Sequence, residues 1–347
     1  MPQTSLHTTT GAPLRIGVLG ASGQLGSCLV REIADSPSAE LGFATTRPDF
    51  DMTNLDGVDA WLDERLDHSG AGPLDVVINA AAHTRVDALD ELVICDYGDA
   101  AIDFESAHRS IEPVRGLVRE VAETGAMPFV IGGDHALMYP DVAAIADIYG
   151  KGKVGVIHFD AHYDAGRFGI GHHLTHGTPV RKLIEQGYVN GSNFIQVGLR
   201  GYIPDDQDLA WMRDQGFRYH FMAEVEKHGW EQVMERAIAE AAEGTDYLYV
   251  SLDIDMLDPA YAPGTGTPEP NGLTPRELFP LLRRLGAETN LVGVELVELN
   301  PLVDPTYVTP LVANRCVREI LTGIAMRKLG LTDPHYLHPD AVDHGQG

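Results

Sequence analysis

The 347-residue chain has few cysteines, few basic residues and no long apolar run. Its three cysteines, Cys28, Cys95 and Cys316, are too scattered for a disulfide framework or a cysteine-based zinc site, and they fit a reducing compartment. No apolar stretch approaches the length of a membrane span, and the opening residues, MPQTSLHTTTGAP, lack the order of a secretory signal. These absences predict a cytoplasmic protein with no membrane partner.

Basic residues are outnumbered by acidic ones, 25 against 51, which gives a formal net charge of -26. This negative charge opposes binding to the phosphates of a nucleic acid, so we expect no nucleic acid partner. With 44% hydrophobic residues, the chain can fill a sizeable core. Its length allows one large α/β domain or two of medium size.

Short apolar runs alternate with helix-length amphipathic segments along most of the chain. This alternation is typical of strands and crossover helices in a parallel sheet, so the predicted fold class is α/β. In the second part of the chain, strands are expected at 128–131, 153–159, 194–199, 247–252 and 290–296. Helices are expected at 106–123, 179–186, 223–242, 274–285 and 307–328.

Three of these strands end in carboxylates and histidines. The segments FVIGGDHAL, IHFDAHYDAG and YVSLDIDMLDP place six such residues just beyond an apolar run: His135, Asp160, His162, Asp164, Asp253 and Asp255. Residues two apart in an extended backbone face the same way, and ligands of open parallel sheets gather beyond the carboxyl ends of the strands. The three segments therefore predict one shared site.

The ligand types in this site indicate divalent metal ions. Four aspartates and two histidines without a thiolate suit Mn²⁺, and Mg²⁺, Fe²⁺, Co²⁺, Ni²⁺ and Zn²⁺ are compatible with the same atoms. Two divalent cations balance four carboxylates, whereas one cation leaves a buried surplus of negative charge. Paired metals at ~3.5–4 Å lower the pKa of a shared water, so the predicted chemistry is hydrolysis.

The motifs GGDH, HFDAHYD, THGTP and SLDIDMLDPAYAPGTGTPEP resemble the ureohydrolase family, which includes arginase, agmatinase and guanidinobutyrase. The resemblance extends from about residue 92 to residue 328. It implies an arginase-like fold of three layers, α/β/α, with a mainly parallel sheet. It also implies a binuclear manganese amidinohydrolase that releases urea and an amine from a small guanidino compound, and a homo-oligomer, either a trimer or a hexamer.

The same resemblance implies two ligand sets that share two carboxylates. One manganese would be held by the first set, His135, Asp160, Asp164 and Asp253. The other would be held by the second set, Asp160, His162, Asp253 and Asp255. Asp160 and Asp253 would thus bridge both ions.

Four further roles follow from the resemblance. Asp164 would orient the attacking hydroxide, and Glu298 in VGVELVELNP would bind the guanidinium by paired charge-assisted hydrogen bonds. His176 in THGTP would shuttle protons, a role suited to a side chain that titrates near neutrality. Thr265 in PGTGTP would line the substrate pocket.

The substrate is left open by the sequence. THGTPVRKLIEQG and IQVGLRG are more similar to the agmatinase and guanidinobutyrase branch than to arginase. Arg167 either repels the amine tail of agmatine and attracts a carboxylate tail, or points into solvent. His172 and His173 match no family ligand and are expected in a loop. Guanidine and alkylguanidines are alternative substrates, and a non-catalytic subunit that supports an active paralogous partner is an alternative function.

The first part of the chain carries a different pattern. GASGQLG places Gly20, Gly23 and Gly26 between an apolar strand at 14–19 and a helix-like segment, which makes them weak candidates for binding a nucleotide cofactor. Together with DVVINAAAHTRVD, this region resembles the N-terminal half of an extended short-chain reductase of the dTDP-4-dehydrorhamnose reductase type, over about residues 14–88. It predicts a partial Rossmann-like βαβ segment.

A working reductase is only a remote alternative. The Y-x-x-x-K pair that such enzymes need occurs once, at Tyr149 and Lys153, in the wrong context. We therefore predict a nucleotide-binding-like segment at 1–88, a ureohydrolase domain at 89–330 and a C-terminal tail at 331–347. The usual first βα unit of a ureohydrolase is not found. Either the strand at 14–19 takes the place of that unit in the sheet, or a protein that joins a reductase-like segment to a ureohydrolase domain folds poorly.

Overall fold

The computed structural model describes residues 92–103, 106–167, 174–202 and 204–331, together with the backbone of three strands within residues 14–78. The chain divides into two compact units, which are described separately. The first comprises Met1–Arg85 and Val93–Asp99, and the second comprises Val86–Leu92 and Ala100–Gly347.

The first unit contains a parallel sheet of three described strands in the order β2-β1-β3. Their bounds are β1 (Leu14–Leu19), β2 (Ala39–Thr45) and β3 (Val76–Ile78). Among the described residues, β1 pairs with β2 and β3 and with no strand of the second unit. The expectation that residues 14–19 join the ureohydrolase sheet is therefore wrong. Gly20, Gly23 and Gly26 lie outside the described residues.

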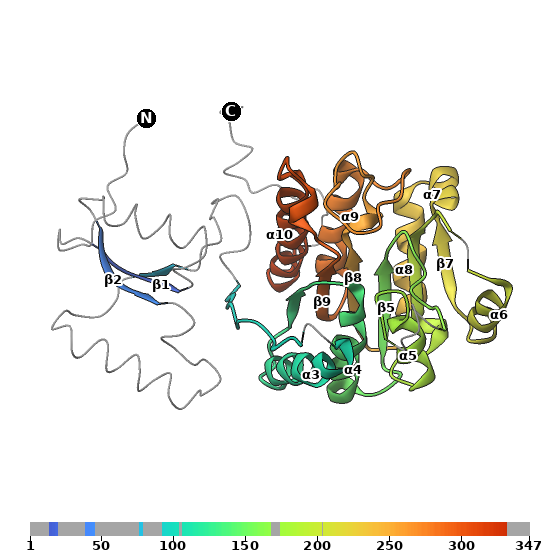
Figure 1. The fold of residues 1–347 in the computed structure, drawn as a ribbon, viewed down its shortest axis with the longest axis horizontal. Helices are drawn as coiled ribbons and strands as arrows, with labels where there is room; N and C mark the ends of the chain where they lie inside the picture. Colours follow the sequence, from blue (N-terminus) through green and yellow to red (C-terminus); the bar gives the residue numbers. More distant parts are fainter. Residues whose placement is uncertain are drawn as a thin grey trace. The chain divides into compact units, whose positions relative to one another are not determined.

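The second unit is built on a sheet of six parallel strands in the order β4-β9-β8-β5-β6-β7 (Figure 1). The strands are β4 (Phe129–Ile131), β5 (Val154–Phe159), β6 (Phe194–Leu199), β7 (Arg218–Phe221), β8 (Tyr247–Asp253) and β9 (Leu291–Val297). The five expected strands are confirmed. The unpredicted strand, β7, has four residues and lies at the edge of the sheet, so its sequence is short and only partly apolar.

Helices cover both faces of this sheet, which confirms the three-layer α/β/α architecture (Figure 1). One face carries α3 (Ala107–Glu123), α4 (Met138–Tyr149) and α5 (Pro179–Glu185). The other carries α8 (Trp230–Ala241), α9 (Pro275–Glu288) and α10 (Val308–Lys328). Strand side chains alternate between the two cores, with Val156 in the first and Ile157 and Phe159 in the second.

One predicted helix differs from the structure, and two helices were not predicted. The helix expected at 223–242 is two helices, α7 (Met222–His228) and α8, because Gly229 adopts a φ of +80° that interrupts the helix. Helix α6 (Asp206–Asp214) and helix α4 were not predicted. Every residue of α4 from Met138 to Ala146 is buried, so this helix has no polar face to produce an amphipathic pattern.

No helix in the described parts of the chain is both long enough and apolar enough to cross a membrane.

Candidate metal centre

The sheet topology brings the predicted ligands together at one edge. Strand β5 ends at Phe159 and pairs with β8, which ends at Asp253, so the two ligand-bearing segments leave the sheet side by side. Strand β4 lies beyond β9 and leads through Gly132 and Gly133 to His135. The side chains of the six predicted ligands are buried, apart from that of His162, which is 25% exposed. The predicted convergence is thus present in the structure.

The first donor set surrounds the Nδ1 atom of His135. This atom lies 3.0 Å from Asp160 Oδ2, 3.1 Å from Asp164 Oδ2 and 3.2 Å from Asp253 Oδ2. It has no properly oriented hydrogen-bond partner among the described residues. Two ligand atoms at right angles and ~2.1 Å from one ion are ~3 Å apart, so these separations fit a divalent cation.

The second donor set is centred on His162 and Asp255. His162 Nδ1 lies 2.9 Å from Asp255 Oδ2 and 3.4 Å from Asp160 Oδ1. Asp160 therefore contributes one oxygen to each set, as expected of a bridging carboxylate. Asp253 gives Oδ2 to the first set, while its Oδ1 accepts the backbone N–H of Asp255 at 2.8 Å.

The two sets are strongly coupled electrostatically. Burial by itself lowers the pKa of His135 and His162, but the surrounding carboxylates outweigh it, and the pKa of His162 rises to about 11. Burial and mutual repulsion raise the pKa of Asp253 and Asp255, whereas the histidines outweigh burial and lower the pKa of Asp160. So many buried carboxylates require protons or cations for balance, and the donor types suit divalent metals.

Glu298 stands next to the first set and is held in a fixed direction. It adopts a left-handed φ of 61°, and its N–H donates to the carbonyl of Gly133 at 2.8 Å. Its Oε1 accepts the N–H of His135 at 2.8 Å, and its Oε2 faces Gly266. Burial raises the pKa of this carboxyl, against the lowering effect of the His135 N–H. A bound cation would favour the charged form.

His176 and Thr265 lie on the same side of the sheet. His176 is exposed and close enough to Glu298 to lower the pKa of that carboxyl. Thr265 is buried, and its hydroxyl has no partner among the described residues. Its loop is tied to the site because Asn300 N–H donates to the Gly264 carbonyl at 2.8 Å and Thr267 Oγ1 lies 3.5 Å from Asp255 Oδ2.

Arg167 is partly exposed and paired with acidic side chains. Its Nε lies 3.0 Å from Asp208 Oδ1, and its other nitrogens contact Asp205 and Gln207 at the start of α6. Since these carboxylates already balance its charge, its effect on a substrate tail stays a prediction. His172 and His173 lie outside the described residues.

A buried polar row beneath the donor sets was not predicted. It runs across the neighbouring strands β6, β5, β8 and β9. Its residues are Gln196, His158, Ser251 and Glu295, and each is paired in the sheet register with the next. All four side chains are fully buried. The signal was in the sequence: His158 and Ser251 each precede a ligand aspartate by two residues, and the alternation that grouped the ligands places them on the same face.

Arg200 is a second unpredicted residue near the ligands. Its guanidinium donates to the carbonyl of Asp255 at 2.6 Å and also to the carbonyls of Leu257, Glu269 and Pro270. It therefore holds the segment that follows β8 against the loop at 269–270. No sequence spacing marks this role, because the partners are backbone atoms.

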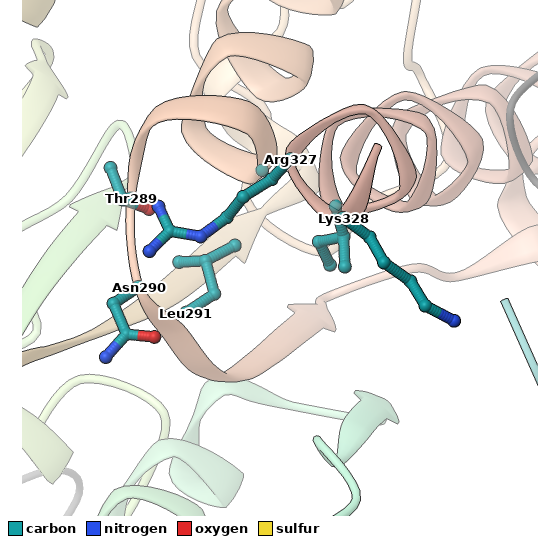
Figure 2. A pocket seen from close by; sticks show the side chains of 7 residues that line it. Thr289, Asn290, Leu291, Arg327 and Lys328 are labelled. Atoms are coloured by element: carbon teal, nitrogen blue, oxygen red, sulfur yellow. The ribbon is translucent and has the colours of Figure 1, made fainter. Parts of the chain in front are cut away.

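A separate cavity of about 390 Å³ lies where two helices end and a strand begins (Figure 2). It is lined by Gly286, Thr289, Asn290, Leu291, Ile324, Arg327 and Lys328. These residues lie at the end of α9, the start of β9 and the end of α10, whereas the donor sets follow the carboxyl ends of the strands. The cavity is therefore not part of the metal centre.

The fold and the site define an α/β protein with donor sets for two divalent cations at the carboxyl edge of a parallel sheet. Residues 72–323 match the arginase family. The mitochondrial agmatinase of Gallus gallus is 35% identical over 244 residues, which cover 69% of this chain and 69% of that protein. Guanidinopropionase of Pseudomonas aeruginosa is 35% identical over 243 residues, covering 70% and 74%. The chain belongs to the arginase family and is a hydrolase of that family.

Solved structures agree with this assignment. Proclavaminate amidino hydrolase from Streptomyces clavuligerus aligns with a TM-score of 0.63 and 31% identity over 69% of this chain and 78% of that chain. Arginase from Bacillus subtilis aligns with a TM-score of 0.60 and 25% identity, covering 89% and 98%. The family is one of binuclear metal enzymes, and this chain contains the corresponding cluster of donors. The reductase-like resemblance of residues 14–88 stays a prediction.

Proposed function

We propose that this protein hydrolyses a small guanidino compound to urea and an amine at a two-manganese centre. The observation that carries the proposal is the position of Asp160, which turns one oxygen to each donor set, with Glu298 fixed beside the first set. The relatives named agmatinase, guanidinopropionase and guanidinobutyrase support a guanidino substrate with a short tail.

The chain's own groups suit this chemistry. Two bound metals would supply a water of lowered pKa between them. Glu298 would pair with the guanidinium through its carboxylate, since a cation there offsets the cost of a buried negative charge. Asp164 places Oδ2 in the first set, and its other oxygen would orient the attacking water. His176, exposed near Glu298, would give a proton to the leaving amine.

Manganese is the proposed metal because the donors are carboxylate oxygens and imidazole nitrogens with no thiolate. Nickel or another divalent metal is an alternative, since imidazole and carboxylate also suit those ions. We also propose that the chain forms a homo-oligomer. The exposed apolar side chains of Leu302, Val303, Tyr307 and Leu311 lie close together in sequence and support an interface there. Light scattering coupled to size-exclusion chromatography would measure the mass.

The test is to load the purified protein with Mn²⁺ or Ni²⁺ and measure urea from agmatine, 4-guanidinobutanoate, 3-guanidinopropanoate, arginine, guanidine and methylguanidine. We expect urea release from one of these compounds, which would identify the substrate. An Asp160→Ala variant is the blank for contaminating activity. Two bound metals without urea from any compound would contradict the proposal. Turnover only after addition of an active paralogue would show a partner-dependent subunit instead.

A further inference from the structure

The polar row beneath the donor sets contains a histidine whose place in the site is ambiguous. The Nε2 atom of His158 lies 2.9 Å from Asp160 Oδ2, the same oxygen that lies 3.0 Å from His135 Nδ1. Ligand atoms of His135, His158, Asp160 and Asp164 all lie within 4.8 Å of one another. By distance alone, His158 is thus a candidate metal ligand.

The hydrogen bonds of Gln196 decide the question. Its Nε2 lies 2.7 Å from the carbonyl oxygen of Tyr163 and 3.2 Å from His158 Nδ1. A carbonyl oxygen only accepts, so the atom that faces it is the amide nitrogen and not the amide oxygen. The second hydrogen of this nitrogen points to His158 Nδ1, which must therefore present a lone pair.

We infer that His158 is a positioning residue for Asp160 and not a metal ligand, and that Gln196 fixes it in the tautomer that carries hydrogen on Nε2. A protonated nitrogen has no lone pair for a metal, and here it faces Asp160 Oδ2 at 2.9 Å as a charge contact that lacks hydrogen-bond geometry. This contact sets the plane of the bridging carboxylate, whose Oδ1 then faces His162. The inference rests on the proposed two-metal function.

His135 contacts Ser251 of the same row and shows the opposite arrangement. Its Nε2 lies 2.8 Å from Ser251 Oγ, where a ring N–H can donate to the hydroxyl oxygen. That arrangement leaves Nδ1 as the lone pair aimed at Asp160, Asp164 and Asp253. His135 and His158 are both buried, and their ring centroids are 4.9 Å apart. Because their contacts with the row differ, His135 presents a lone pair to a metal and His158 presents an N–H donor.

The first experiment measures the tautomer of His158 directly in metal-free protein. Histidine labelled with ¹⁵N gives distinct chemical shifts for protonated and unprotonated ring nitrogens, and a His158→Gln spectrum assigns the peaks. We expect His158 to carry its hydrogen on Nε2, with Nδ1 unprotonated. Hydrogen on Nδ1, with a lone pair on Nε2, would overturn the inference whether or not the protein proves to be an enzyme.

The second experiment measures Mn²⁺ binding by calorimetry in three variants. His158→Phe removes the donor, and we expect the affinity for Mn²⁺ to fall by about 10- to 100-fold. His158→Gln keeps an N–H near the position of Nε2 and should recover most of the affinity. His220→Gln is the matched control. His220 is another buried histidine of the sheet, 3.1 Å from Glu224 and 3.0 Å from Glu240, away from the donors.

The outcomes separate this inference from the proposed function. Wild-type protein that binds no metal would refute the two-metal proposal itself. Wild-type affinity in a folded His158→Phe protein would refute the role of His158 alone. If both His158→Phe and His158→Gln bind one ion where the wild type binds two, His158 is a ligand and the inference is wrong. The Co²⁺-loaded proteins add a spectroscopic check, because loss of a ligand changes the visible absorption bands.

Discussion

The side chain of Asp160 contacts three histidines of the site. Its Oδ2 lies 3.0 Å from His135 and 2.9 Å from His158, and its Oδ1 accepts the N–H of His162 at 2.6 Å. The backbone N–H thereby fixes Oδ1, while Oδ2 lies between two imidazole nitrogens with no hydrogen bond among the described residues, and the carboxylate is completely buried. Such fixed donors reduce the reorganisation that metal binding requires.

This geometry predicts unequal effects of two aspartate substitutions. Asp160→Ala removes an oxygen from each donor set, so both metals should be lost and urea release should disappear. Asp255→Ala affects only the second set, so about one metal per chain should remain. Elemental analysis of dialysed protein measures the two stoichiometries. Two ions retained by Asp160→Ala would contradict the bridging role.

Metal binding should also depend on pH. Carboxylates outweigh burial and raise the pKa of His162 from 6.5 to about 11, so near neutral pH the metal-free protein holds a proton that a metal must displace. The affinity for Mn²⁺ should therefore rise about tenfold per pH unit for each proton released. Without metal, the raised pKa stabilises the fold fully below pH 6.5, and this contribution is lost as the pH approaches 11. Calorimetry between pH 6 and pH 8 measures the slope, and a flat profile would contradict this linkage.

Glu298 should affect the substrate and not the metals. Its Oε1 bonds to the backbone of His135, and neither oxygen belongs to a donor set. Glu298→Gln keeps the size of the side chain but removes the charge that pairs with a guanidinium. We expect kcat/KM to fall by about 100-fold or more with unchanged metal content. Loss of a metal from this variant would instead show that Glu298 supports the first set.

At the scale of elements, helices α9 and α10 approach so closely that only glycine fits between them. A Cβ atom on Gly323 would lie 2.1 Å from the Arg283 carbonyl oxygen, and one on Gly286 would lie 2.4 Å from the Ile320 carbonyl oxygen. Both obstacles are backbone atoms, so neither can move without shifting a helix. This contact fixes the layer that covers one face of the sheet.

Gly323→Ala should therefore lower the free energy of unfolding by about 1–3 kcal/mol, because the helices must separate. Gly116→Ala in α3 is the matched control. Gly116 is exposed, and nothing lies within 4 Å of a Cβ atom built there. There the substitution should raise stability by about 0.5–1 kcal/mol. Urea denaturation measures both. Equal effects of the two substitutions would show that the helix contact adjusts without cost.

At the scale of the whole molecule, every described residue of the site belongs to the second compact unit. The described residues of the first unit form a three-stranded parallel sheet and include no donor to either metal set. The family match begins at residue 72 and so includes the last part of the first unit, while the described donors all lie in the second unit.

Gly23→Val should accordingly leave urea release and metal content unchanged. The change adds a branched side chain to the glycine-rich segment of the first unit, where it would disturb any nucleotide binding but no described site residue. Urea assays before and after the change, together with NADPH titration of the wild type, measure both aspects. Loss of hydrolysis in a folded Gly23→Val protein would show that the first unit supports the active site.

The sequence by itself determined the fold class, five strands of the main sheet and the six ligand candidates. These features follow from local rules. Apolar runs mark strands, residues two apart share a face, and parallel strands end at a common edge. Asp160, His162 and Asp164 were therefore grouped before any distance was known. The buried helix α4 and the short edge strand β7 escaped prediction because burial on all sides or marginal length removes the periodic signal.

Only the tertiary structure decided which atoms of these residues meet. The register of β5 with β6 and β8 places Gln196 and Ser251 on either side of His158, and no spacing within one segment contains that pairing. The contact of Arg167 with Asp208 in α6 likewise joins residues 41 positions apart and could not be read from local spacing. Hydrogen-bond partners and charge neighbours come from distant parts of the chain. Local patterns can therefore nominate a ligand, but its contacts across the sheet decide its role.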